Sequence, residues 1–108
     1  MPQKRQQPRR LPQHRPPTHP GEMLLEEFLK PLNLSQAEAA RRLKMPLNRL
    51  NELIKGKRGI TPDTALRLSE LFKASPELWM NLQAAWDLWH AREDRKARGE
   101  AGSIKAIA

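Results

Sequence analysis

Polar side chains that could contact base edges are interleaved with apolar residues over positions 47–55, LNRLNELIK. In the DNA major groove, Asn pairs with adenine, Arg with guanine and Glu with cytosine, and Leu can touch the thymine methyl group. Leu50, Leu53 and Ile54 recur at helical spacing, which predicts a helix with these three residues facing inward. Its outward face then carries the polar candidates and one leucine: Leu47, Asn48, Arg49, Asn51, Glu52 and Lys55. These residue types and their spacing indicate a helix that could read a base sequence.

A second short helix is predicted immediately before this one. Ser35 is a favourable N-cap, and Glu38, three residues later, would complete a capping box. The apolar positions of this helix are Ala37, Ala40 and Leu43, and the small Ala39 beside them would let another helix cross closely. Two short helices joined by a tight turn over residues 35–55 are typical of a helix-turn-helix, which places its second helix in the major groove.

The alternative is an ordinary helical hairpin with a solvated outer face, and charge argues against it. Between positions 35 and 60 only Glu38 and Glu52 are acidic, against seven basic residues: Arg41, Arg42, Lys44, Arg49, Lys55, Lys57 and Arg58. The whole chain of 108 residues carries a net charge of +8, which calls for a polyanion or an acidic protein as partner. A positive field concentrated on this segment favours a nucleic-acid partner.

Three further helices are predicted around this motif, and no strand. The first covers GEMLLEEFLKPL, with an apolar stripe of Met23, Leu24, Phe28 and Leu32, joined by Leu25 and Leu29. A later helix starts at the Thr61 cap with Pro62 at its first position, and its buried stripe is Ala65, Leu68 and Phe72 with Leu66 and Leu71 beside it. Ser75 and Pro76 repeat the start signal for a fifth helix. The expected fold is therefore all-α with five helices.

The chain length supports one domain. Residues 1–19 hold five basic residues, no acid and five prolines, which predicts an extended or disordered basic arm. Residues 20–91 form the expected helix-turn-helix domain, and residues 92–108 a polar C-terminal tail. In the fifth helix Trp79, Trp86 and Trp89 fall along one stripe. Trp79 would close the core, whereas Trp86 and Trp89 are predicted to form a dimer interface, because so small a core has little room for them.

Other classes of function fit the sequence poorly. The chain has no cysteine, so it offers no disulfide or zinc-thiolate site, and we expect neither a metal nor another cofactor. His90 with Glu93 and Asp94 could suggest a metal site or an enzyme, but no further ligand converges there and a solvated helix end is the simpler interpretation. A basic RNA-binding ribonuclease would usually present aromatics on a sheet. The absence of a long apolar run argues against membrane insertion, and cytoplasmic location is expected.

Several of these segments resemble one family. HPGEMLLEEFLKPL, LSQAEAARRL, LNRLNELIKGKRGIT, TALRLSELF and SPELWMNLQAAWDL, spanning His19 to about Trp89, are similar to the HigA-type antitoxins, or virulence-associated protein I-like regulators, of the lambda-repressor-like helix-turn-helix superfamily. The resemblance implies a homodimer that binds an inverted-repeat operator in double-stranded DNA. It also implies repression of the protein's own operon and neutralisation of a small basic toxin, a ribosome-dependent ribonuclease. A stand-alone dimeric repressor without a toxin remains the alternative.

The resemblance also implies roles for single residues. Ser35 and Gln36 would begin the helix that touches phosphate, and Lys57 and Arg58 would lie in a phosphate-flanking loop. The reading positions would be Asn48, Arg49, Asn51 and Glu52. Two positions depart from expectation: Lys44 stands where the family's turn usually has glycine, so a positive φ there would carry a cost, and Glu52 places a negative charge on the reading face, which disfavours non-specific binding.

Overall fold

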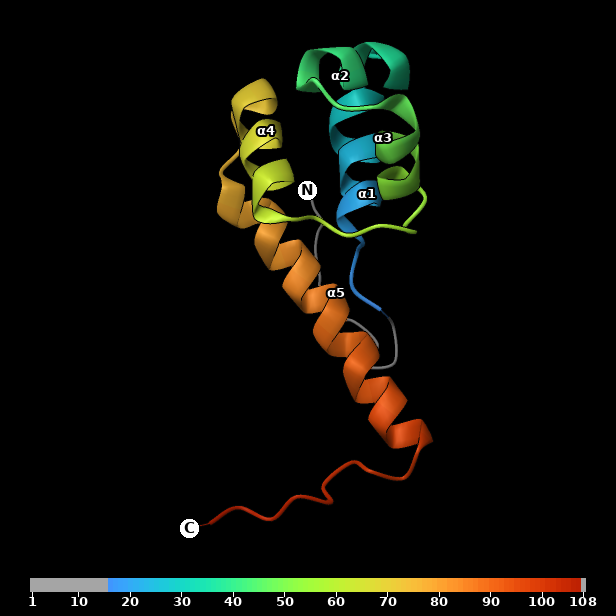
Figure 1. Ribbon diagram of the computed structural model, residues 1–108, viewed down its shortest axis with the longest axis vertical. Helices are drawn as coiled ribbons and strands as arrows, with labels where there is room; N and C mark the ends of the chain where they lie inside the picture. The colour runs from blue at the N-terminus through green and yellow to red at the C-terminus, as the bar shows by residue number, and fades with distance from the viewer. Residues whose placement is uncertain (1–15, 108) are drawn as a thin grey trace, which may run out of the picture.

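The computed structural model describes residues 16–107, and within that range the chain is all-α with no strand. The elements are α1 (Pro20–Leu24), the π-helical turn η1 (Leu25–Leu29), α2 (Gln36–Leu43), α3 (Leu47–Ile54), α4 (Pro62–Phe72) and α5 (Pro76–Ala97). Because η1 continues α1 without a break, the five predicted helices are confirmed. In Figure 1, α1 lies beside α3, α2 crosses one end of this pair, and α4 leads into the long α5. Residues 1–15, most of the predicted basic arm, lie outside the described residues.

The start of α1 is fixed by His19, Pro20 and Gly21. The Nδ1 atom of His19 accepts a hydrogen bond from the Gly21 backbone N–H at 2.9 Å, so His19 is the N-cap, and Pro20 takes the first helical position. A Cβ atom on Gly21 would lie 1.9 Å from the carbonyl oxygen of Leu53, so only glycine permits this approach of α1 to the end of α3. His19 was assigned to the arm by the sequence, but its side chain is buried.

The apolar stripe of the first helix ends earlier than its periodicity predicts. Lys30 donates its backbone N–H to the carbonyl of Leu25 at 3.0 Å, a five-residue spacing that belongs to a π-helical turn. Residues 30–33 then form a turn instead of continuing the helix. Leu24 and Leu29 are buried as expected, but Leu32 is 61% exposed because it falls in this turn. The prediction that Leu32 faces the core is therefore wrong.

The predicted N-caps of the later helices are confirmed. Side-chain oxygens of Ser35, Thr61 and Ser75 accept the backbone N–H groups of Glu38, Thr64 and Leu78. The capping box is only half formed, because the Glu38 carboxylate accepts hydrogen bonds from Arg41 and Arg42 instead of returning to Ser35. These competing cations lie on the same helix, one turn further on.

Lys44 does adopt the left-handed conformation, with φ 58° and ψ 46°. Its strain is offset by hydrogen bonds around it: the Met45 N–H reaches the Ala40 carbonyl at 3.0 Å. The guanidinium of Arg67 donates to the carbonyls of Leu43 and Lys44 at 2.8 and 2.9 Å. The end of α2 is thus closed by a side chain of α4, which satisfies carbonyl groups that a helix end leaves unpaired.

The core is apolar and draws on every helix; its buried residues are Leu24, Leu29, Ala39, Ala40, Leu43, Met45, Leu50, Leu53, Ile60, Ala65, Leu68 and Trp79. Two sequence expectations fail here. Ala37 is exposed and Ala39 takes its place, because the Ala39–Ala40 edge of α2 faces the neighbouring helices. Leu66 is 52% exposed, since it points away from the face that Ala65 and Leu68 bury.

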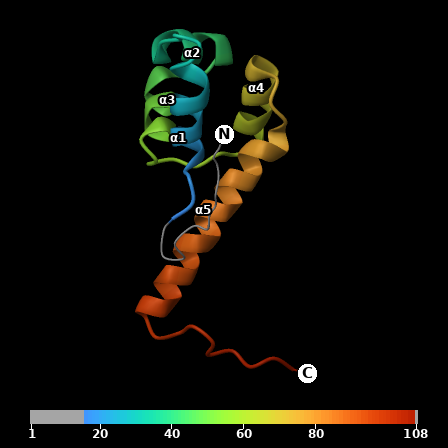
Figure 2. The same ribbon diagram turned by 180° about the vertical axis from the view of Figure 1, so that it is seen from behind.

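The helix α5 belongs to the core only over its first turns. Trp79 is fully buried, with its ring 5.2 Å from that of Phe28. Beyond Trp86, whose ring still contacts His19, the helix leaves the other helices and runs on alone, as the opposite view in Figure 2 also shows. It ends at Ala97, six residues past the position 91 at which the sequence suggested a boundary. A long stretch of helix therefore stands outside the core.

Candidate nucleic-acid interface

The outward side of α3 collects the residues that the sequence selected as base-reading. Leu50 and Leu53 are buried against the other helices, which fixes the orientation of α3. The opposite side is open: Leu47, Asn48 and Lys55 are exposed, and Arg49, Asn51 and Glu52 are partly buried. One short helix thus presents amide, guanidinium and carboxylate groups together, and these are the groups that base edges pair with.

Arg49 is held toward the start of α4. Its guanidinium donates to the hydroxyl oxygen of Thr64 at 3.3 Å, and the Thr61 and Thr64 hydroxyls are 3.2 Å apart. Thr64 is buried and was not singled out by the sequence, because a threonine after a helix start has many other uses. Through this contact α4 positions a side chain of α3.

Lys57 and Arg58 lie in the loop that follows α3, and both are exposed. Gly56 opens the loop with φ 78°, and the Lys57 N–H returns to the Glu52 carbonyl at 2.9 Å. The Arg58 guanidinium meets the Glu52 carboxylate at 2.8 Å. Glu52, expected to contact cytosine, is therefore paired within the chain.

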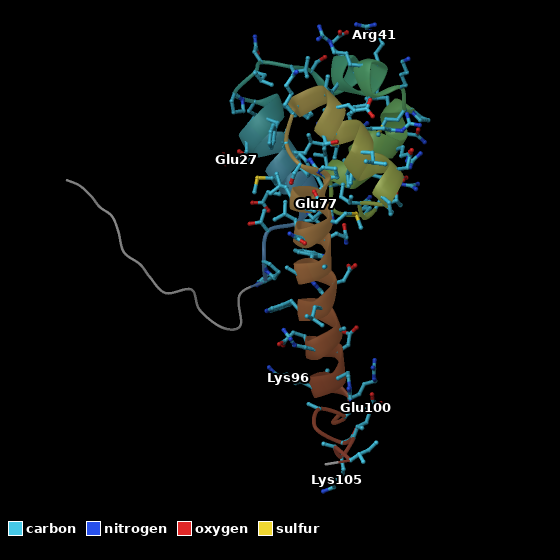
Figure 3. The ribbon with its side chains drawn as sticks, turned by 90° about the vertical axis from the view of Figure 1, so that its left-hand side faces the viewer. Glu27, Arg41, Glu77, Lys96, Glu100 and Lys105 are labelled. Atoms are coloured by element: carbon cyan, nitrogen blue, oxygen red, sulfur yellow. The ribbon has the colours of Figure 1, made fainter. Side chains whose placement is uncertain are left out.

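Ser35 and Gln36 stand at the start of α2. The Ser35 hydroxyl is exposed and already serves as the N-cap, and Gln36 occupies the first helical position, partly buried. Glu38 lies in the first turn of α2, and hydrogen bonds from Arg41 and then Arg42, in the last turn, lower its pKa to about 2. Figure 3 shows Arg41 at the end of the molecule opposite Lys96 and Lys105. The basic residues of the motif are therefore remote from those of the C-terminal segment.

His19 lies between the loop after α3 and the helix α5. The sequence analysis did not identify it as a structural residue. Its ring stands edge-on to that of Trp86, with centroids 4.9 Å apart, and a Cβ on Gly56 would lie 3.8 Å from the imidazole. Burial lowers the pKa of His19, an effect that the charges of Asp87 and Glu22 partly oppose. Because Nδ1 accepts the Gly21 N–H, the neutral ring carries its proton on Nε2. The HPGE segment could have indicated this role, because it belongs to the family resemblance, but only the fold shows that its histidine caps α1 and packs on α5.

Gln83 is the second residue that sequence reasoning missed. It is a buried polar side chain of α5 whose Oε1 atom accepts the Ile60 N–H at 2.7 Å. Its Nε2 atom donates to the Asp87 carboxylate at 2.9 Å. Gln83 follows Trp79 by four residues and therefore lies on the same, core-facing side of the helix. This spacing could have predicted that Gln83 is a buried hydrogen-bond donor and acceptor.

The two tryptophans selected for a dimer interface differ in their surroundings. Trp86 is partly covered by His19 and by His90, whose ring centroid is 4.2 Å away. Trp89 contacts His90 at 5.0 Å and is also partly buried. Leu88, which the sequence did not select, is 52% exposed on the same helix. The accessible apolar surface of α5 is therefore broader than the predicted stripe.

The described residues contain neither a cluster of metal ligands nor a membrane-spanning helix. Between residues 16 and 107 no three His, Cys, Asp or Glu side chains gather where they could hold a metal ion. His90, the candidate ligand from the sequence, has its Nδ1 atom 3.0 Å from the Trp86 carbonyl oxygen. No helix in this range combines the length and apolar character needed to span a membrane.

Comparisons with known proteins agree with this geometry. The family model described as Helix-turn-helix matches residues 25–79. Virulence-associated protein I of Dichelobacter nodosus is 45% identical over 82 residues, which is 76% of each chain. Among solved structures, the Pseudomonas aeruginosa antitoxin HigA with higBA promoter has 37% identity and a TM-score of 0.78, over 85% of this chain and 99% of that one. The antitoxin GraA in complex with its operator has 37% identity and a TM-score of 0.76, over 85% and 93%.

Proposed function

Since this chain belongs to the helix-turn-helix family, within the group of HigA-type antitoxins, we propose that it binds the operator of its own operon as a dimer and neutralises a toxin encoded beside it. The family consists of DNA-binding regulators and not of enzymes, and the chain is accordingly a DNA-binding antitoxin. We place its action in the cytoplasm, where the operator DNA lies.

The observation that carries the DNA-binding part is the orientation of α3. Asn48 and Asn51 face outward because Leu50 and Leu53 are buried. We assign base reading to the outward residues of α3 and phosphate contact to the residues flanking it; the base-reading set is Leu47, Asn48, Arg49, Asn51, Glu52 and Lys55, and the phosphate set is Ser35, Gln36, Lys57 and Arg58. Specificity would come from the first set and salt-dependent affinity from the second.

A dimer accounts for the part of α5 that stands outside the core. We propose that Trp86 and Trp89 contribute to a two-fold interface, with the exposed Leu88 beside them. A symmetric dimer would read an inverted repeat, and half-site centres about 34 Å apart are expected for one helical turn.

The proposed toxin is small and basic, so its docking surface should be acidic. Glu22, Glu26 and Glu27 are exposed on the first helix, and of these Glu26 is paired with Lys30 at 2.8 Å. Glu22 and Glu27 are therefore the acidic groups best able to attract a ribonuclease, by steering that accelerates association.

Two experiments test this function. Selection of bound sequences from random DNA should return an inverted repeat that also occurs upstream of the gene. The adjacent short reading frame, expressed alone, should arrest growth, and co-expression of this chain should relieve the arrest. Reversing Glu22 and Glu27 to Lys should abolish relief, whereas the matched change Glu100→Lys, at the far end of the molecule in Figure 3, should not. No arrest from the adjacent frame would reduce the protein to a stand-alone repressor.

A further inference from the structure

The loop that carries Lys57 and Arg58 is held from two sides. On the α3 side, Glu52 receives the Lys57 backbone N–H through its carbonyl and the Arg58 guanidinium through its carboxylate. On the α5 side, Gln83 accepts the Ile60 N–H at 2.7 Å. The two basic residues lie between these anchors, so both ends of the segment are fixed.

The α5 anchor brings the loop backbone close to the Gln83 side chain. A Cβ atom on Gly59 would lie 2.9 Å from the carboxamide of Gln83, so the backbone approaches this side chain as nearly as glycine allows. Ile60 is buried, and its N–H would be left without a partner if the Gln83 oxygen were removed. Because an unpaired buried N–H is costly, the loop would move to satisfy it.

The same helix carries the residues assigned to the dimer. Gln83 is three residues before Trp86, within one uninterrupted helix, and Trp86 reaches Gly56 through the ring of His19. The loop is thus bound to α5 directly at Ile60, whereas at Gly56 it lies near His19, which packs on Trp86. A shift or rotation of α5 would act on Lys57 and Arg58 through the hydrogen bond between Gln83 and Ile60.

We propose that Gln83 is a positioning residue for DNA binding, which holds the Lys57–Arg58 loop at the phosphates and links that loop to the helix of the proposed dimer. The inference rests on the proposed function, because it takes Lys57 and Arg58 as phosphate-binding residues. A merely structural Gln83 would stabilise the fold without affecting how many phosphates the protein neutralises.

The variant Gln83→Met tests this, because methionine has a similar length but cannot accept the Ile60 N–H with comparable strength. Leu29→Val, a buried change in η1 at the other end of the domain, is the control for reduced stability.

Operator affinity is measured from low to high salt for the wild type and both variants. Each phosphate that the protein no longer neutralises makes the negative slope of log K against log salt shallower by about 0.9. We expect Gln83→Met to neutralise up to two fewer phosphates, with faster amide exchange at Ile60, and Leu29→Val to keep the wild-type slope.

Two results would overturn the inference: a wild-type slope in Gln83→Met, or an equally reduced slope in Leu29→Val. Sedimentation of both variants checks that the oligomeric state is unchanged. The proposed function is judged separately, by whether the wild-type protein prefers its operator over unrelated DNA of equal length.

Discussion

The Glu52 carboxylate accepts two hydrogen bonds from the Arg58 guanidinium, at 3.1 and 2.8 Å, so an acidic residue of the reading helix holds a basic residue of the following loop. Both side chains are nearly half exposed. A phosphate that approaches Arg58 must therefore compete with a carboxylate already in place, and it also meets the negative charge of Glu52. We expect this arrangement to disfavour non-specific binding to any duplex.

Glu52→Gln should raise affinity for unrelated DNA and lower discrimination of the operator. The amide removes the charge that opposes phosphate and releases Arg58, while removal of one base-specific hydrogen bond costs about 1–3 kcal/mol of specificity. The measurement is the ratio of operator to random-DNA dissociation constants at fixed salt. Glu93→Gln, whose carboxylate pairs with Lys96 late in α5, is the matched control and should leave the ratio unchanged.

Arg49→Ala and Asn51→Ala should each remove operator preference while the helical circular dichroism is unchanged. Arg49 and Asn51 are partly buried and lie outside the apolar core, and Arg49 contacts only the Thr64 hydroxyl there, so their removal should weaken DNA binding and disturb packing little. About 1–3 kcal/mol of discrimination is expected per variant. Asn81→Ala, on the exposed side of α5, serves as control. Wild-type binding by both variants would show that α3 is not the reading helix.

Leu88→Gln combined with Trp89→Gln should yield a monomer with weakened operator binding, because these side chains leave apolar surface on the free part of α5. Trp86 is left intact because it also packs on His19. Leu66→Gln is a close control, since Leu66 and Leu88 are both 52% exposed. Sedimentation velocity distinguishes the outcomes, and an unaltered dimer would place the interface elsewhere.

Stability should fall as the solution is acidified below about pH 6.5. Burial lowers the pKa of His19 beneath 6.5, so the unfolded chain takes up a proton first and is stabilised relative to the native state. The contribution is complete above pH 6.5 and disappears as pH falls toward the lowered pKa. The charges of Asp87 and Glu22 oppose this lowering of the His19 pKa, and the charge of His90 adds to it. Melting temperatures between pH 7.5 and 5 should decline less in His19→Asn, because asparagine caps without titrating; an equal decline would exclude His19 as the cause.

Deletion of residues 2–17 should flatten the salt dependence of DNA binding if the arm binds phosphate. That segment holds Lys4, Arg5, Arg9, Arg10 and Arg15 and no acid. The slope should change by about 0.9 for every phosphate that the arm neutralises in the full-length protein. Replacing Arg92, Lys96, Arg98 and Lys105 by Gln removes basic residues from the other terminus and should leave the slope intact. An unchanged slope in the deletion would mean that the arm is only a solvated tail.

Much of the fold was predictable because its signals are local. Ser35, Thr61 and Ser75 cap the helices that follow them. The helical spacing of Leu50 and Leu53 correctly predicted which side of α3 is buried. Leu32 was wrongly predicted to be buried because a π-helical turn breaks the 3.6-residue period before it. No residue type in this segment predicts that turn.

The interactions that organise the candidate site are long-range, and sequence spacing does not reveal them. Arg67 reaches the end of α2 from 23 and 24 residues away, and Gln83 reaches Ile60 across 23 residues. Such polar side chains look like solvated surface until the fold brings their partners near. Glu38 shows the converse: the motif suggested a capping partner, but two arginines on its own helix compete more strongly for the carboxylate.

The chain has three tryptophans and no tyrosine, so its near-ultraviolet emission comes from indole alone. Trp79 is sealed in the core, and its Nε1 atom has no hydrogen-bond partner within residues 16–107. Trp86 and Trp89 lie against an imidazole outside the core. An indole in apolar surroundings emits at shorter wavelength than one near water, and a protonated imidazole quenches it. The unlabelled protein therefore carries separate optical reporters of core integrity and of events along α5.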